Sequence, residues 1–300
     1  MKKDVGLFLK GFAMGAANVI PGVSGGTIAF ISGIYERLIK SLKSFDLSIL
    51  NLLMQGHFRE VVGKTDLKFL SILLSGITLS IFSLAHLLEY ILKDYETFTL
   101  AFFFGLVAAS ILGVGRQIGK FSLGVIITFF IGYSVAVSIA FITPLEANDH
   151  WAYVVLCGMV AISSMILPGL SGSYVLLLMG NYVLMLQSIS HLNFKFLIPF
   201  VLGCLLGVVM FSRIFNYFFD HFQDATISLL TGFVVGSLLI IWPWKTTHYI
   251  EIENREKAAG YDWYFPSFDT EMIIGVGLML LGFIVVSGIE HLGKKANSQG

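Results

Sequence analysis

Six apolar stretches in this 300-residue sequence are each long enough to cross a lipid bilayer. A transmembrane helix needs about 17 to 25 predominantly apolar residues. Stretches of this kind lie near 67–92, 97–115, 121–143, 194–219, 226–243 and 271–289. Only 13% of the residues are charged, against about 25% in an ordinary soluble domain. The sequence therefore predicts an all-α integral membrane protein surrounded by membrane lipids.

Two further apolar segments, near 5–39 and 151–187, are interrupted in the middle by proline, glycine and serine. The interruptions run from Pro21 to Thr27 (PGVSGGT) and from Pro168 to Tyr174 (PGLSGSY). Proline and glycine break a continuous helix, because proline lacks the N–H donor and glycine leaves the backbone free to turn. Each segment is therefore predicted to form a broken or re-entrant helical hairpin.

The two interruptions belong to an internal duplication. After each of them the same residues follow at the same spacing, with Gly33 and Tyr35 recurring as Gly180 and Tyr182. A second block recurs at its own constant offset, with pairs that include Lys68/Lys195, Gly76/Gly203, Tyr90/Tyr217, Gly105/Gly232 and Ser110/Ser237. Constant offsets of this kind indicate a repeat, with residues 1–145 as the first half and 146–300 as the second. The N-terminal segment resembles a secretory signal, but its internal counterpart makes it part of the fold.

One re-entrant hairpin plus about three spans gives each half an odd number of crossings, so the halves should be inverted. Inverted repeats are typical of transporters. The lysines and arginines gather in segments that this layout places on one side, namely before residue 67, at 116–120 and at 294–295. By the positive-inside rule both termini should be cytoplasmic. The aromatic-rich segment 244–270 should then cap the outer surface.

The two interruptions are the strongest candidates for a binding site. Non-helical backbone inside a membrane is tolerated only within protein or against a cavity. Helix starts in the two turns would offer N–H groups and hydroxyls to an anion such as phosphate. The predicted phosphate-binding residues are Ser24, Gly25, Gly26, Thr27, Ser171, Gly172 and Ser173. The alternative is that the turns only cap helices and let them pack closely.

Ionisable residues inside the spans form a second group of candidates. His86 and Glu89 lie one helical turn apart, and the duplication places Arg213 and Asn216 at the corresponding positions. Charged residues in a span are costly and call for a partner or a wet cavity. Arg213 could be the cation of the phosphate site, and Glu89 with His86 could couple transport to protons. Snorkelling to the interface explains Arg213 equally well.

Several classes of function find no support. The histidines and the two cysteines have no metal-ligand spacing, and the sequence holds no nucleotide-binding loop. We therefore expect no metal and no cofactor. The formal net charge is zero, so nothing predicts a nucleic-acid partner. An integral-membrane enzyme would need a nucleophile-base pair or a metal cluster, so an enzyme is not predicted.

The interruptions resemble those of the bacterial polyprenyl-phosphate transporters, a family formerly catalogued as a domain of unknown function. The resemblance rests on Asn18 to Thr27 (NVIPGVSGGT) and on Leu167 to Ser173 (LPGLSGS), together with the chain length and the two halves. It implies a flippase in the bacterial cytoplasmic membrane that returns undecaprenyl phosphate to the cytoplasmic leaflet for cell-wall synthesis. From the residues alone, a carrier of a small soluble anion and, less readily, a lipid-modifying enzyme remain as alternatives.

Overall fold

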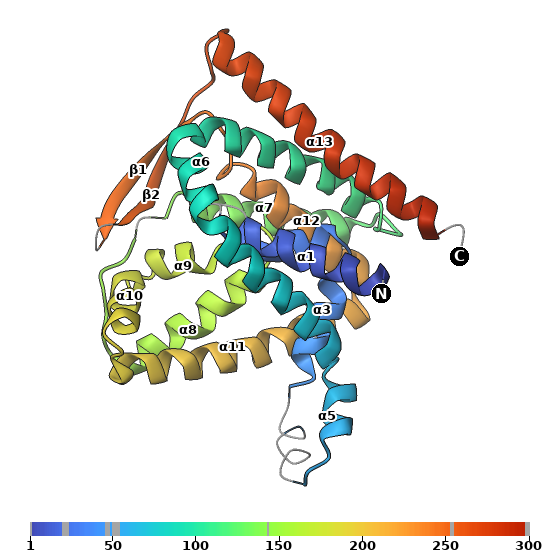
Figure 1. The fold of residues 1–300 in the computed structure, drawn as a ribbon, viewed down its shortest axis with the longest axis vertical. Coiled ribbons are helices and arrows are strands. Elements are labelled where there is room, and N and C mark those ends of the chain that lie inside the picture. The colour runs from blue at the N-terminus through green and yellow to red at the C-terminus, as the bar shows by residue number, and fades with distance from the viewer. Residues whose placement is uncertain are drawn as a thin grey trace. The chain divides into compact units, whose positions relative to one another are not determined.

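The computed structural model describes residues 2–19, 24–45, 49, 55–142, 144–252 and 255–297, and most of them are helical (Figure 1). These residues form two compact units. Unit 1 contains residues up to 85 together with 144–223, and unit 2 contains 86–142 together with 224–297. Each unit thus draws one part from each half of the chain.

Unit 1 is built from short and long helices of both halves. From the first half it takes α1 (Lys2–Val19), α2 (Gly25–Ile31), α3 (Tyr35–Lys43), α5 (Phe58–Lys64) and the beginning of α6 (Leu67–Gly115). From the second half it takes α8 (Trp151–Ile166), α9 (Gly172–Leu178), α10 (Tyr182–Ser190) and α11 (Phe194–His221). Helix α11 packs along α8 and also contacts α3 (Figure 1).

Unit 2 contains the remaining spans and a hairpin. Its helices are the second part of α6, α7 (Leu123–Ala140), α12 (Gln223–Ser237) and α13 (Thr270–Asn297). Strands β1 (Lys245–Ile252) and β2 (Arg255–Trp263) pair antiparallel, with an irregularity between His248 and Tyr249.

The two broken segments have matching helices. Helices α2 and α9 begin and end at equivalent positions of the two halves, and so do α3 and α10. A glycine with positive φ separates the helices of each pair, Gly33 at 71° and Gly180 at 77°. Helices α9 and α10 are bent by 117° relative to each other. Each broken segment therefore contains three helices, because α1 and α8 precede these pairs.

Close helix contacts also recur at equivalent positions of the two halves. A Cβ atom on Gly76 would collide with the carbonyl oxygen of Phe8, and one on Gly203 would collide with that of Val155. Gly76 matches Gly203 within the second repeated block, and Phe8 matches Val155 within the first. Helix α6 therefore approaches α1 in the first half as α11 approaches α8 in the second. In each case a glycine leaves room for the neighbouring backbone.

In unit 2 the halves exchange partners. Gly105 on α6 lies against Met279 on α13, and Gly232 on α12 lies against Phe129 on α7. Gly105 and Gly232 are matching positions, so the second span of each half packs on the third span of the other half. These contacts also make Phe129 and Met279 equivalent positions of the third spans, a correspondence that the sequence alone did not reveal.

Five of the six predicted spans are helices long and apolar enough to cross a membrane. Among the described residues these are 67–84, 94–115, 123–140, 194–221 and 270–287. The break between the first two is Tyr95, whose backbone is not helical (φ −138°, ψ 40°). The sixth predicted span, 226–243, falls on α12 and the turns that follow it. Helix α12 ends at Ser237, after which tighter i→i+3 hydrogen bonds continue to Trp242 before Pro243.

The all-α class needs one correction, because segment 244–270 contains the β-hairpin. Strand β1 reads KTTHYIEI, and β-branched and aromatic residues favour strands. Its base is fixed by Lys245, whose ammonium group donates to the carbonyl of Ile240 and lies 4.4 Å from the centre of the Tyr261 ring. Burial lowers the pKa of Lys245 to about 8, and nearby Glu96 partly opposes that shift.

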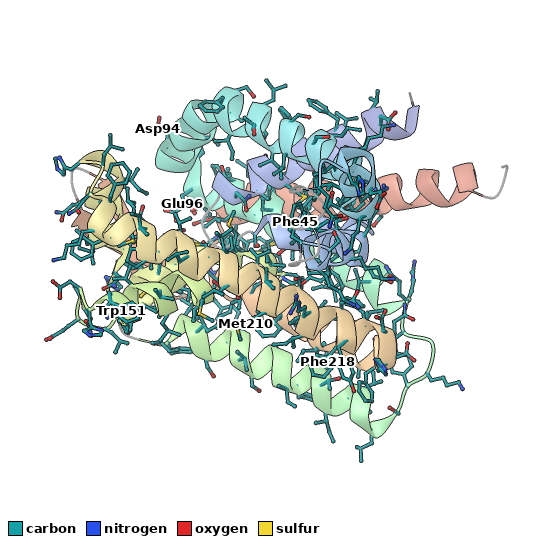
Figure 2. All side chains as sticks on the ribbon, turned by 90° about the horizontal axis from the view of Figure 1, so that it is seen from below. Phe45, Asp94, Glu96, Trp151, Met210 and Phe218 are labelled. Atoms are coloured by element: carbon teal, nitrogen blue, oxygen red, sulfur yellow. The ribbon has the colours of Figure 1, made fainter. Side chains whose placement is uncertain are left out.

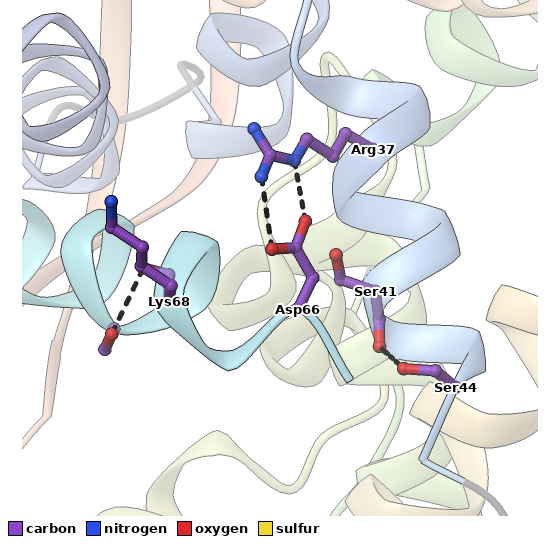
Figure 3. A network of polar contacts seen from close by, with 6 residues as sticks. Arg37, Ser41, Ser44, Asp66 and Lys68 are labelled. Atoms are coloured by element: carbon purple, nitrogen blue, oxygen red, sulfur yellow. Dashed lines mark hydrogen bonds and ion pairs between the residues drawn. The ribbon is translucent and has the colours of Figure 1, made fainter. Parts of the chain in front are cut away.

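Basic residues near the N-terminus are held by acidic partners (Figure 3). Arg37 on α3 donates to both carboxylate oxygens of Asp66, at 2.7 and 3.1 Å, and lies over the ring of Phe69. Lys68 at the start of α6 pairs with Asp4 on α1 at 3.1 Å. These contacts tie α1, α3 and the start of α6 together at one end of unit 1.

Candidate functional site

The two interrupted segments meet inside unit 1. The Ser24 hydroxyl, just before α2, lies 3.3 and 3.4 Å from the carbonyl oxygens of Met165 and Leu167. In return, the N–H of Gly169 donates to the Thr27 hydroxyl at 2.7 Å. Residues far apart in the sequence are thus joined by hydrogen bonds in both directions. Residues 20–23 of the first interruption, including Pro21 and Gly22, lie outside the described residues.

The donors of the first turn are already in use. The N–H of Gly25 donates to the Asn18 side-chain oxygen at 2.7 Å, and the N–H of Gly26 donates to the Ser24 hydroxyl at 3.1 Å. Ser24 and Thr27 are each only 2% exposed. The first turn is therefore a closed cap in which side chains satisfy the start of α2.

Gly26 has a steric role at this junction. A Cβ atom on Gly26 would collide with the carbonyl oxygen of Ile166 and lie 3.1 Å from that of Leu167. Real Cβ atoms do not approach backbone oxygens so closely, so only glycine lets the two segments meet here. The corresponding residue of the second turn is Ser173, which carries a side chain and is exposed.

The second turn is open by comparison. The hydroxyls of Ser171 and Ser173 lie 3.1 Å apart and are exposed, and the Ser171 side chain makes no capping hydrogen bond to α9. No described residue accepts a hydrogen bond from the N–H of Gly172 or Ser173. The turn thus presents two hydroxyls that bond only to each other and two backbone donors that have no acceptor within the described chain.

The link between the two short helices of each broken segment is held by a different contact in each half. Asn181, fully buried, accepts from the N–H of Asn148 and donates to its carbonyl, at 2.9 and 2.8 Å. In the first half, Lys10 donates to the carbonyl of Ser32 at the end of α2, at 2.7 Å. The position of Asn181 beside the break favours a role in satisfying backbone groups, but its partner Asn148 lies in a loop without a motif. Lys10 reads as one more basic residue near the N-terminus, so its contact could not be predicted.

Arg213 is not brought to the turns by any contact in the described part of the chain. Its side chain is exposed and makes no hydrogen bond or ion pair with a described residue. It lies on α11, which also directs Met210 and Phe218 outward (Figure 2). The side chains of His86 and Glu89 on α6 lie outside the described residues.

Asn216, the counterpart of Glu89 in the second half, pairs with another residue of α11. Asn216 is buried, and its amide donates to Asp220 at 2.5 Å. The pKa of Lys40 on α3 is raised, mainly by the hydrogen bond that Lys40 donates to Glu36. The negative charge of Asp220 raises it further. Helices α3 and α11 contact each other in this region, where the rings of Tyr35 and Phe219 lie 6.0 Å apart.

Comparison with known proteins identifies the family. A profile of the VCA0040-like family, described as undecaprenyl phosphate translocase-like, matches residues 14–259. A Vibrio cholerae protein named polyprenyl-phosphate transporter is 35% identical over 301 aligned positions, covering 96% of both chains. A Staphylococcus aureus protein of the same name is 33% identical, covering 81% of this chain and 87% of its own. No solved structure matches. Because the profile spans both interrupted segments and the relatives cover most of the chain, this protein belongs to the undecaprenyl phosphate translocase-like family.

Proposed function

We propose that this protein is a membrane transporter that returns polyprenyl phosphate, such as undecaprenyl phosphate, to the cytoplasmic leaflet. The observation that carries this proposal is the open Ser171–Ser173 turn, set against a closed first turn in a chain of the translocase family. Polyprenyl-phosphate transporter is the name of both relatives. Such transport requires binding and release of an anionic headgroup but no chemical step, so the protein is not an enzyme.

The headgroup would be held at the second turn. A phosphate that enters a membrane loses its hydration and needs fixed donors in return. Ser171 and Ser173 supply hydroxyls, and Gly172 and Ser173 supply N–H groups. The first turn, with Ser24, Gly25, Gly26 and Thr27, would act as the support that holds the second turn in position. Arg213 and Glu89 would act in steps that bring their side chains to the lipid.

The two halves would be inverted relative to each other, with both ends of the chain in the cytoplasm. The proposal rests on the odd number of crossings in each half and on the gathering of basic residues around Arg37, Lys68 and Arg116. Single cysteines placed near the two ends should react with an impermeant thiol reagent only from the cytoplasmic side. Reaction of the two ends from opposite sides would contradict the inverted layout.

A carrier of a small soluble anion is the competing function. A long lipid tail must stay in the membrane while the headgroup crosses, whereas a soluble anion has no tail. In vesicles that contain the purified protein, fluorescent polyprenyl phosphate should move between leaflets faster than in protein-free vesicles. The matching neutral polyprenol should show no such acceleration. Acceleration of inorganic phosphate uptake without lipid movement would instead support the soluble-anion carrier.

A further inference from the structure

An apolar groove in unit 2 has one cationic residue in its lining. It has a volume of about 610 Å³ and lies between the end of α6, the loop that follows, α7 and α12. Ligand pockets typically measure about 300–1,000 Å³. Its walls are apolar, with exposed Leu112, Phe121 and Ile126 at the rim. Arg116 is the charged residue among those that line it.

The two hydroxyls in the wall are already engaged in hydrogen bonds within the protein. The Ser228 hydroxyl donates to the carbonyl of Val125 at 2.6 Å, and the Thr231 hydroxyl donates to that of Ile227 at 2.6 Å. Arg116, in contrast, is exposed and forms no ion pair with a described residue.

One carboxylate in this part of unit 2, that of Asp224, is already engaged by backbone donors. Asp224 accepts from the N–H groups of Gly119 and Lys120, at 2.9 and 3.1 Å. These hydrogen bonds hold the loop after α6 against the start of α12. The guanidinium of Arg116 therefore stays available to an anion from outside the chain.

An apolar groove with one guanidinium in its lining is complementary to a lipid with a long apolar chain and one phosphate. Arginine suits phosphate because its planar donors can bind two oxygens at once. A second pocket in unit 2, about 350 Å³ and lined by α6 and α13, has no charged residue among those that line it. The cation therefore distinguishes the first groove from an ordinary lipid-facing hollow.

We infer that this groove is a second binding site for polyprenyl phosphate, with the beginning of the tail between α6, α7 and α12 and the phosphate on Arg116. The inference rests on the proposed function. Arg116 belongs to the basic segments that we assign to the cytoplasm, so the site would hold the lipid in the cytoplasmic leaflet. It is additional to the Ser171–Ser173 turn and shares no residue with it.

Gly115 offers a clean way to fill the groove. It lines the groove, and a Cβ atom added to it would meet no other atom within 4 Å. Gly115→Leu should therefore occupy the space for the tail without disturbing the helices. Gly124→Leu is the matched control, because Gly124 lies nearby on α7, does not line the groove and has only the Ser122 hydroxyl within 4 Å.

The test uses polyprenyl phosphate with a photoreactive group near the start of its tail, added to the purified protein in vesicles. Labelled peptides should map to residues 111–129. Gly115→Leu should reduce this labelling about tenfold. Arg116→Gln should raise the lipid concentration needed for half-saturation by about fivefold, the upper end of what one exposed charge pair contributes. Gly124→Leu and Lys120→Gln should leave labelling unchanged, as should excess phosphatidylglycerol.

Two results would overturn the inference. Unchanged labelling of 111–129 in Gly115→Leu would show that the tail does not lie in the groove. If phosphatidylglycerol prevented the labelling as well as unlabelled polyprenyl phosphate does, the groove would bind membrane lipids in general. Either result leaves the proposed function standing if the wild-type protein still moves polyprenyl phosphate between leaflets. Loss of that movement in the wild type would instead reject the proposed function itself.

Discussion

Gly26→Val is expected to destabilise the protein more than any other single substitution considered above. The added Cβ atom collides with the backbone of Ile166, and the backbone of α8 cannot yield as a flexible side chain would. Overpacking of this kind costs about 1–3 kcal/mol or more. It would also separate Ser24 and Thr27 from their partners in the second turn. Thermal unfolding in detergent should show a clear loss of stability, and lipid movement should cease.

Gly6→Val on α1 is the matched control, because a Cβ atom at Gly6 has no neighbour within 4 Å. It introduces the same side chain into a helix without a collision, so stability and lipid movement should stay close to those of the wild type. Equal unfolding temperatures for Gly26→Val and Gly6→Val would mean that the two turns do not meet as closely as the contacts indicate.

The double substitution Ser171→Ala and Ser173→Ala is expected to give the largest loss of lipid affinity at little cost in stability. Both hydroxyls are exposed and contact each other rather than the rest of the chain. Removing a hydrogen bond to a charged ligand costs about 1.5–3 kcal/mol, or roughly ten- to a hundredfold in affinity. Equilibrium binding of polyprenyl phosphate to the purified variant measures the effect.

Two controls separate binding from support at the turns. Ser138→Ala removes a hydroxyl on α7 that bonds only to its own helix, and it should change neither stability nor affinity. Ser24→Ala removes the acceptor for the N–H of Gly26 and the contacts to Met165 and Leu167. It should lower stability by about 1 kcal/mol, as the loss of a helix cap does. A stable double variant with unchanged affinity would exclude the second turn as the headgroup site.

The parts of the fold that could be predicted from the sequence follow from composition and local pattern. Long apolar runs specify most of the spans, because a membrane demands a minimum length. The two interruptions, which contain Ser24 and Pro168, specify helix breaks because their proline and glycine residues act on the local backbone. The two repeated blocks predicted matching elements in the two halves, and Gly76 and Gly203 indeed lie at matching helix contacts.

The features that could not be predicted depend on contacts between distant residues. The exchange of partners at Gly105 and Gly232 follows from packing, and no local pattern encodes it. The β-hairpin at 245–263 follows a helix that already ends at Ser237. The sequence shows that the two turns differ at Gly26 and Ser173, but Ser24 and Ser171 are alike in it. Only their surroundings show that one hydroxyl is buried and the other is open.

The central claim is that the second turn binds the phosphate of the lipid, and the most direct measurement is the affinity for polyprenyl phosphate relative to that for the matching neutral polyprenol. The wild-type protein should bind the phosphate at least about tenfold more tightly than the alcohol. The double substitution Ser171→Ala and Ser173→Ala should remove most of that difference, because it weakens the binding of the phosphate lipid and leaves the binding of the alcohol unchanged. Equal affinity of the wild-type protein for the two lipids would contradict the claim, and the turns would then be elements of helix packing alone.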